Sequence, residues 1–267
     1  MEKHDLDRLA RAVYYLENPT WTATITDIIG MPVEWAIRKL PAKANQIISN
    51  ATSKAISKAV KVAVLTMNAE HRGAPKKWCH RGAVATSGAI GGFFGLAGLT
   101  VELPASTIIM LRSIADVARS QGEDITKVDS QLQCVSVFAL GSKSWDDDDA
   151  SESSYYAIRA VLAKLISEAG SYIAEKGFVE EGAPIIVKFI VRIASRFQGI
   201  ISEKVATESI PVIGALGGAS INLLFMNHFQ RVATGHFIIR SLERAYSAEE
   251  VKIEYSRIAA NQRAPRS

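Results

Sequence analysis

A chain of 267 residues, 48% of them apolar and with a formal net charge of +4, is long enough to bury a large core. No Ser-, Gly- or Pro-rich linker interrupts it, so we expect one domain over 1–267: an irregular and partly helical N-terminal segment (1–41) and a core (42–267). The charged N-terminus lacks the apolar stretch of a secretion signal, and Cys79 and Cys134 belong to no CxxC pair. We therefore expect a cytoplasmic protein with neither a disulfide framework nor a metal site.

Apolar residues recur at three- and four-residue spacing along most of the chain, and alternating strand patterns are almost absent. The predicted class is therefore all-α, a single helical bundle-like domain. The segment 18–41 is rich in proline and tryptophan and is expected to be irregular with a short helix. The predicted helices cover residues 6–16, 42–67, 107–119, 155–174, 185–201 and 221–245. Left-handed caps are expected near helix ends at Gly122, Gly141, Gly177 and Gly182.

Residues 82–101 form an uncharged run that contains six glycines. At about 1.5 Å per residue it is just long enough to cross a hydrocarbon layer of roughly 30 Å, but each glycine costs a helix about 1 kcal/mol. A second uncharged run, 209–227, shares its GxxxG spacing, which lets helices approach closely. We predict two central glycine-rich apolar helices. Two interpretations stay open: a tight crossing in a soluble bundle, or re-entrant insertion with Phe93 and Phe94 facing lipid.

The two glycine-rich runs share a short repeat. GAIGG at 88–92 recurs as GALGG at 214–218, and Arg-Ser-Ile at 112–114 recurs as Arg-Ser-Leu at 240–242. The near-equal offsets indicate two related halves, but short echoes of glycine and alanine also arise by chance. Both explanations stay open.

Positive charge is concentrated in one region of the chain. Residues 35–101 contain ten basic residues and a single acid, Glu70. In the predicted 42–67 helix, Lys54, Lys58 and Lys61 line a strip beside an apolar stripe, a pattern that suits the surface of an anionic membrane. A solvated face that keeps the protein soluble is the alternative. Nucleic acid is not expected as a partner, because no interleaved aromatic residues accompany the lysines.

Charged residues also occur inside the apolar pattern. Glu102 follows the first glycine-rich run, and Pro104 suits a first helical turn, so Glu102 is expected either to start a helix or to pair with a buried arginine. Arg112 and Asp116 are four residues apart and can pair along one helix.

The C-terminal part carries a second polar cluster. Its members His236, Arg240 and Glu243 share a helical face, and Asn222 and His228 precede them on the same periodic segment. Such a cluster can hold a metal, act as an acid–base pair or fix helices through buried hydrogen bonds. Because no HExxH, GxSxG or Walker motif is present, we expect a structural network without a metal or cofactor.

Five strings, in the same order, closely resemble the EcsC family of bacteria. They are GAIGGFFGLAGLTVELPASTIIMLRSIADVAR, CVSVFALG, DASESSYYAIRA, PVIGALGGASINLLFMNHFQ and GHFIIRSLERAY. That family is named for a gene beside an ABC exporter, and the resemblance implies no defined reaction. The matching positions that we expect to matter most are Glu102, Arg112, Asp116, Tyr156, Arg159, Asn222, His228, His236 and Arg240.

Together these patterns favour a non-enzymatic, membrane-associated helical protein that assists or regulates an envelope or export process. Its expected partners are anionic lipid and a membrane protein such as an ABC exporter, and its expected location is peripheral or re-entrant at the inner face of the cell membrane. The alternative is a lipid-acting hydrolase that uses His228 or His236 with Glu102 or Asp116. That alternative requires these side chains to lie within about 3 Å hydrogen-bond reach of one another.

Overall fold

The computed structural model describes residues 1–18, 20–30, 32–67, 95–141, 154–177, 183–209 and 218–263. These residues form helices and no strand, which confirms the predicted all-α class. The helices are α1 (Lys3–Glu17), α2 (Thr20–Ile29), α3 (Val33–Arg38), α4 (Ala44–Thr66), α6 (Gly95–Ser120), α7 (Val128–Leu140), α8 (Ser154–Lys176), α9 (Pro184–Glu208), α11 (Gly218–Ala245) and α12 (Ala248–Arg263).

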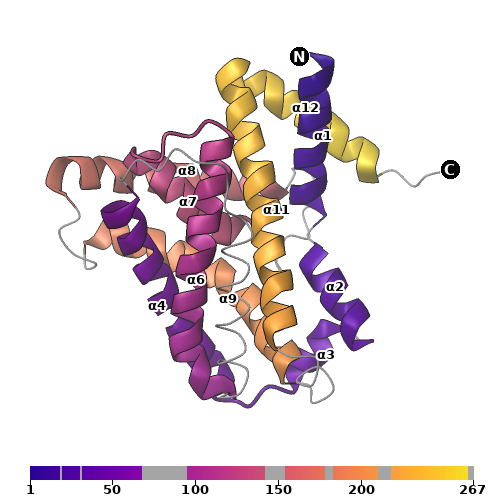
Figure 1. The fold of residues 1–267 in the computed structure, drawn as a ribbon, viewed down its shortest axis with the longest axis vertical. Coiled ribbons are helices and arrows are strands. Elements are labelled where there is room, and N and C mark those ends of the chain that lie inside the picture. Colours follow the sequence, from indigo (N-terminus) through magenta and orange to yellow (C-terminus); the bar gives the residue numbers. More distant parts are fainter. Residues whose placement is uncertain are drawn as a thin grey trace.

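Two long helices, α6 and α11, run side by side along the long axis of the molecule (Figure 1). Helix α4 packs against α6, and α9 packs against α4. On the other side, α1 packs against α11, and α12 packs against both α1 and α11. The apolar face of each of these helices lies toward a shared core, as the three- and four-residue spacing predicts.

Helix α7 is enclosed by the rest of the molecule. Every residue from Ser130 to Leu140 is buried, and the helix packs against α4, α6, α8, α9 and α11. Its sequence therefore shows no polar face and no helical period, so the spacing argument did not predict it. Five of the other helices are therefore packed around α7.

The other differences from the predicted helices lie mainly at the ends of elements. The N-terminal segment contains two helices, α2 and α3, where one short helix was expected. Helix α12 was not predicted, because its mostly polar sequence conceals the buried spacing of Val251, Tyr255 and Ala259. Helix α6 begins at Gly95 and not at residue 107, so Pro104 lies inside it and the first-turn expectation is wrong.

The structure tests the expected glycine caps in part. Gly122 and Gly177 have the expected positive φ values of 81° and 70°, whereas Gly141 has a φ of −83° and is not a left-handed cap. Gly182 lies outside the described residues. So do residues 82–94, which are most of the first glycine-rich run, and residues 210–217 of the second, so the two central glycine-rich helices and the two related halves stay predictions.

One helical glycine sets the distance between α1 and α11. A Cβ atom added at Gly235 would lie 2.8 Å from Leu16 Cγ and 3.1 Å from the Ala12 carbonyl oxygen. Because the second contact is with backbone, a larger side chain has to push the two helices apart. By contrast, an added Cβ at Gly199 in α9 meets nothing within 4 Å.

We predict opposite effects for two Gly→Ala substitutions. Gly235→Ala forces α1 away from α11 and lowers the free energy of unfolding by about 1–3 kcal/mol, the usual cost of overpacking. Gly199→Ala, the matched control, raises it by up to about 1 kcal/mol through helix propensity alone. Urea unfolding of both variants checks this, and equal stabilisation by the two substitutions would contradict the close approach at Gly235.

Candidate functional site

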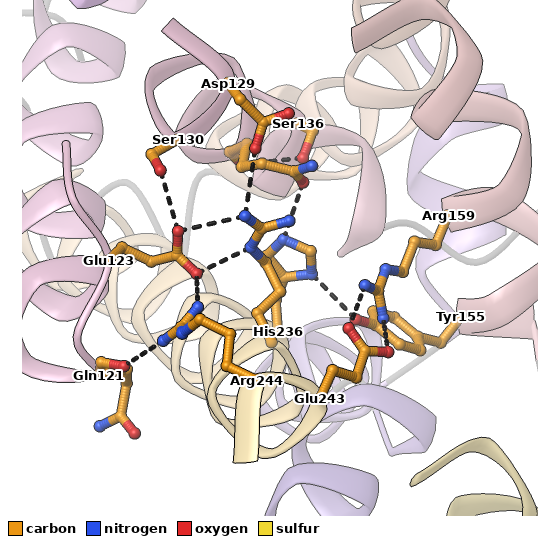
Figure 2. Close-up of polar contacts among 12 residues, drawn as sticks. Gln121, Glu123, Asp129, Ser130, Ser136, Tyr155, Arg159, His236, Glu243 and Arg244 are labelled. Atoms are coloured by element: carbon orange, nitrogen blue, oxygen red, sulfur yellow. Dashed lines mark hydrogen bonds and ion pairs between the residues drawn. The ribbon is translucent and has the colours of Figure 1, made fainter. Parts of the chain in front are cut away.

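Glu123 joins the end of α6 to α7 and α11 through one buried carboxylate (Figure 2). Arg240 donates from Nε to Glu123 Oε1 at 2.8 Å and from Nη2 to Oε2 at 3.2 Å. Arg244 donates to Oε1 as well, and the Ser130 hydroxyl donates to Oε2 at 2.9 Å. The carboxylate is therefore surrounded by donors from two other helices.

These donors determine the charge of Glu123. Burial alone raises the pKa of Glu123, but the hydrogen bonds from Arg240, Ser130 and Arg244, together with the charge of Arg240, outweigh it, so the pKa lies below its ordinary value. The group stays ionised at neutral pH. It is thus a structural anion and not a proton donor.

His236 lies next to this ion-paired group and is buried between α7 and α8. Its Nε2 lies 3.2 Å from Gln133 Oε1, and its Nδ1 lies 2.9 Å from the Tyr155 hydroxyl. Because an amide oxygen only accepts, Nε2 carries the proton and Nδ1 accepts from Tyr155. Burial, with Arg159 and Arg240 nearby, holds the pKa of His236 well below its usual range. Neither ring nitrogen is available to a substrate.

Arg159 and Glu243 fix α8 to α11 beside His236 (Figure 2). Arg159 Nη1 donates to Glu243 Oε1 at 2.6 Å, and Nη2 donates to the second oxygen, a bidentate pair. The guanidinium also lies 5.9 Å from the ring centres of Tyr155 and Tyr156. Tyr255 of α12 stacks on Tyr155. Three helices, α8, α11 and α12, therefore meet beside His236.

A second buried charged group lies where α6, α9 and α11 meet. Lys204, with 1% of its side chain exposed, donates to Glu102 Oε2 at 3.2 Å and lies 3.4 Å from Glu208 Oε1. Asn222 donates to the other oxygen of Glu102 at 3.2 Å. Burial lowers the pKa of Lys204, but Glu208 and Glu102 outweigh burial and hold it above its ordinary value. The amine stays protonated and is no nucleophile.

This arrangement corrects both expectations for Glu102. The residue lies inside α6, because that helix begins earlier than predicted, and its cationic partner is a lysine from α9. Arg112 and Asp116 also differ from the predicted pair. In the described part of the chain, Arg112 reaches Thr66 at 3.4 Å and Asp116 pairs with Arg119 at 2.7 Å.

His228 occupies a third position, at the end of α7. Its Nε2 donates to the Gly141 carbonyl oxygen at 3.0 Å. A Cβ at position 141 would lie 2.6 Å from this nitrogen, so close approach and not backbone conformation explains the glycine there. Burial lowers the pKa of His228 to about 4. The imidazole is therefore neutral and bonded to backbone.

The four residues of the hydrolase alternative are not brought together. His228 bonds Gly141, His236 bonds Gln133 and Tyr155, Glu102 holds Lys204, and Asp116 holds Arg119. No hydrogen bond joins either histidine to either carboxylate within the described residues. Across those same residues, no three His, Cys, Asp or Glu side chains gather as a metal site would require.

The lysines predicted to contact a membrane lie on α4. Lys54, Lys58 and Lys61 are exposed, while Ala51, Ala55 and Ala59 face the core. Phe93 and Phe94 lie outside the described residues. In the part of the chain that the structure describes, one helical stretch, Gly98–Ser120, has the length and apolar composition to cross a membrane, and 56% of its most apolar window is buried inside the protein.

A model of the EcsC protein family matches residues 17–242. This chain belongs to the EcsC family. No curated protein and no solved structure matches it. The matched span includes every polar contact described above except those of Glu243, Arg244 and Tyr255, which follow it.

Several residues that organise this EcsC family member were not singled out from the sequence. Glu123, Gln133 and Tyr155 act through partners about 80 to 120 positions away, and helical spacing carries no information on such contacts. Lys204 is one of four cations in the amphipathic helix α9, a pattern more typical of a solvated face. Of the predicted polar cluster, Arg159, Arg240 and Glu243 lie at one end with Tyr156, whereas Arg112 and Asn222 lie elsewhere.

The two buried histidines make the stability of this EcsC family member depend on pH. The folded pKa values of His228 and His236 lie below the ordinary histidine value, so the unfolded chain binds more protons as the pH falls below about 6.5. Above that pH their full contribution to the free energy of unfolding is present. Between about pH 6 and 5 it is lost at up to about 1.4 kcal/mol per pH unit for each histidine. Urea unfolding across this range measures the loss.

Histidine NMR signals provide the direct check. The imidazole shifts of His228 and His236, assigned by substitution, should stay in the neutral position down to about pH 5. Midpoints near pH 6.5 for both would contradict their burial as neutral, hydrogen-bonded groups.

Proposed function

We propose that this protein associates peripherally with the anionic inner surface of a cell membrane and acts there as a non-enzymatic accessory or regulator of an envelope or export process. The observation that carries this proposal is the exposed cationic face of α4, formed by Lys54, Lys58 and Lys61. A membrane protein, such as an exporter, is the partner that such a role implies.

The charges on α4 differ from those in the rest of the protein. The helix contains no acidic residue, and Lys54 and Lys58 form no ion pair within the described structure. Elsewhere, arginines such as Arg159 and Arg240 are neutralised by carboxylates. Unpaired lysines near an anionic bilayer contribute about 1 kcal/mol each to binding. The unneutralised positive charge of α4 is therefore available to an anionic membrane surface.

The structure favours contact through charge and not through insertion of the apolar stripe of α4. Ala51, Ala55 and Ala59 are already buried, because α4 packs against α6 and α9. Helix α3, which precedes α4, exposes Trp35, whose ring lies 5.2 Å from Lys39 Nζ. Tryptophan beside a cation is typical of membrane–water interfaces. We do not propose the hydrolase alternative, because its two histidines and two carboxylates are engaged in separate contacts.

Charge reversal on α4 tests the proposal. The intact protein should float with phosphatidylcholine vesicles only when they also contain phosphatidylglycerol. Lys54→Glu/Lys58→Glu/Lys61→Glu should reduce the bound fraction at least tenfold, since three cations become three anions.

The matched control is Lys3→Glu/Arg11→Glu/Lys127→Glu, which changes the net charge equally at exposed positions outside α4. It should retain most of the binding. Equal loss in both variants would show that net charge and not the α4 face is responsible, and failure of the unmodified protein to float would overturn the proposal.

A further inference from the structure

The first half of α9 repeats the chemistry of α4 on a second helix. Helix α9 contains no acidic residue from residue 184 to residue 202, and Lys188 and Arg192 in its first half are exposed. Neither side chain forms an ion pair within the described structure. Two unpaired cations, one turn apart, therefore add to the exposed positive charge of the protein.

Helices α4 and α9 are direct neighbours in the bundle. Helices α4 and α9 pack against each other, and both pack against the enclosed helix α7. Their buried faces therefore point toward α7, and their exposed faces point away from it. In Figure 1 α9 passes behind α4 and α6.

Apolar side chains accompany the cations on α9. Val187 is 39% exposed and Val191 is 57% exposed, and the two are one helical turn apart. Each directly precedes one of the cations, Lys188 and Arg192. Single exposed aliphatic residues are ordinary on protein surfaces, but a pair of them interleaved with unpaired cations is typical of helices that lie in a membrane interface.

We propose that the first half of α9 is a second membrane-contacting element, in which Val187 and Val191 enter the headgroup region of an anionic bilayer while Lys188 and Arg192 meet lipid phosphates. This rests on the proposed function and adds an apolar contribution to it. Anionic lipid is the occupant that the charges favour, because no acidic side chain interrupts the cations of α4 or of residues 184–202.

The two contributions respond differently to salt. Attraction between lysines and lipid is screened as ionic strength rises, whereas burial of valine is not. The intact protein should therefore keep a residual bound fraction on phosphatidylcholine–phosphatidylglycerol vesicles at about 0.5 M salt.

The test compares Val187→Ser/Val191→Ser with the intact protein by flotation at low and high salt. At high salt the bound fraction of the double variant should be about tenfold lower than that of the intact protein. At low salt the decrease should be smaller. Ile253→Ser, at an exposed aliphatic position on α12, is the matched control and should bind like the intact protein. Lys188→Glu/Arg192→Glu should reduce binding chiefly at low salt.

Circular dichroism and unfolding transitions like those of the intact protein establish that these surface variants fold. If the serine variant binds like the intact protein at high salt, or if Ile253→Ser loses as much, the inference about α9 is wrong while the role of α4 stands. If the intact protein floats with no vesicle, the proposed function fails and the inference fails with it.

Discussion

From Ser130 to Leu140 every side chain of α7 is buried, including four polar ones, Ser130, Gln131, Gln133 and Ser136. A polar group removed from water without a partner costs about 1–3 kcal/mol, so the surroundings of α7 have to supply hydrogen bonds. In the connection between α6 and α7, Glu123 accepts from Ser130 and the Ile125 carbonyl accepts from the Gln131 amide, while His236 of α11 donates to Gln133. Arg240 and Arg244 of α11 in turn hold the Glu123 carboxylate that receives the Ser130 hydroxyl.

The same enclosure separates the polar residues into two groups with different roles. On the side of α8, α11 and α12, Arg159 and Arg240 are neutralised by glutamates and His236 is bonded by Tyr155, so these groups are not available to a ligand. On the side of α4 and α9, the helices use their apolar faces to cover α7 and leave unpaired cations outside. The histidines that suggest catalysis from the sequence thus stabilise the fold, whereas plain surface lysines form the more promising functional face.

Sequence patterns predicted the helices that have one exposed face, because burial of the other face produces the three- and four-residue spacing seen in α1, α4, α8, α9 and α11. They could not predict α7, which has no exposed face. For the polar cluster, spacing placed His236, Arg240 and Glu243 on one helix face, but their partners Glu123, Gln133 and Arg159 come from distant parts of the chain. A left-handed helix cap was the expected reason for the glycine at position 141. The structure shows that the imidazole of His228 excludes a side chain there.

Hydrogen–deuterium exchange with and without anionic vesicles tests this separation most directly. We expect the amides of α7 and α11 to be the most protected from exchange, with no change on addition of vesicles. Amides of α4 and of the first half of α9 should gain protection when vesicles are added. Gain of protection at α8, α11 and α12 in place of α4 and α9, or rapid exchange in α7 of the free protein, would contradict this separation.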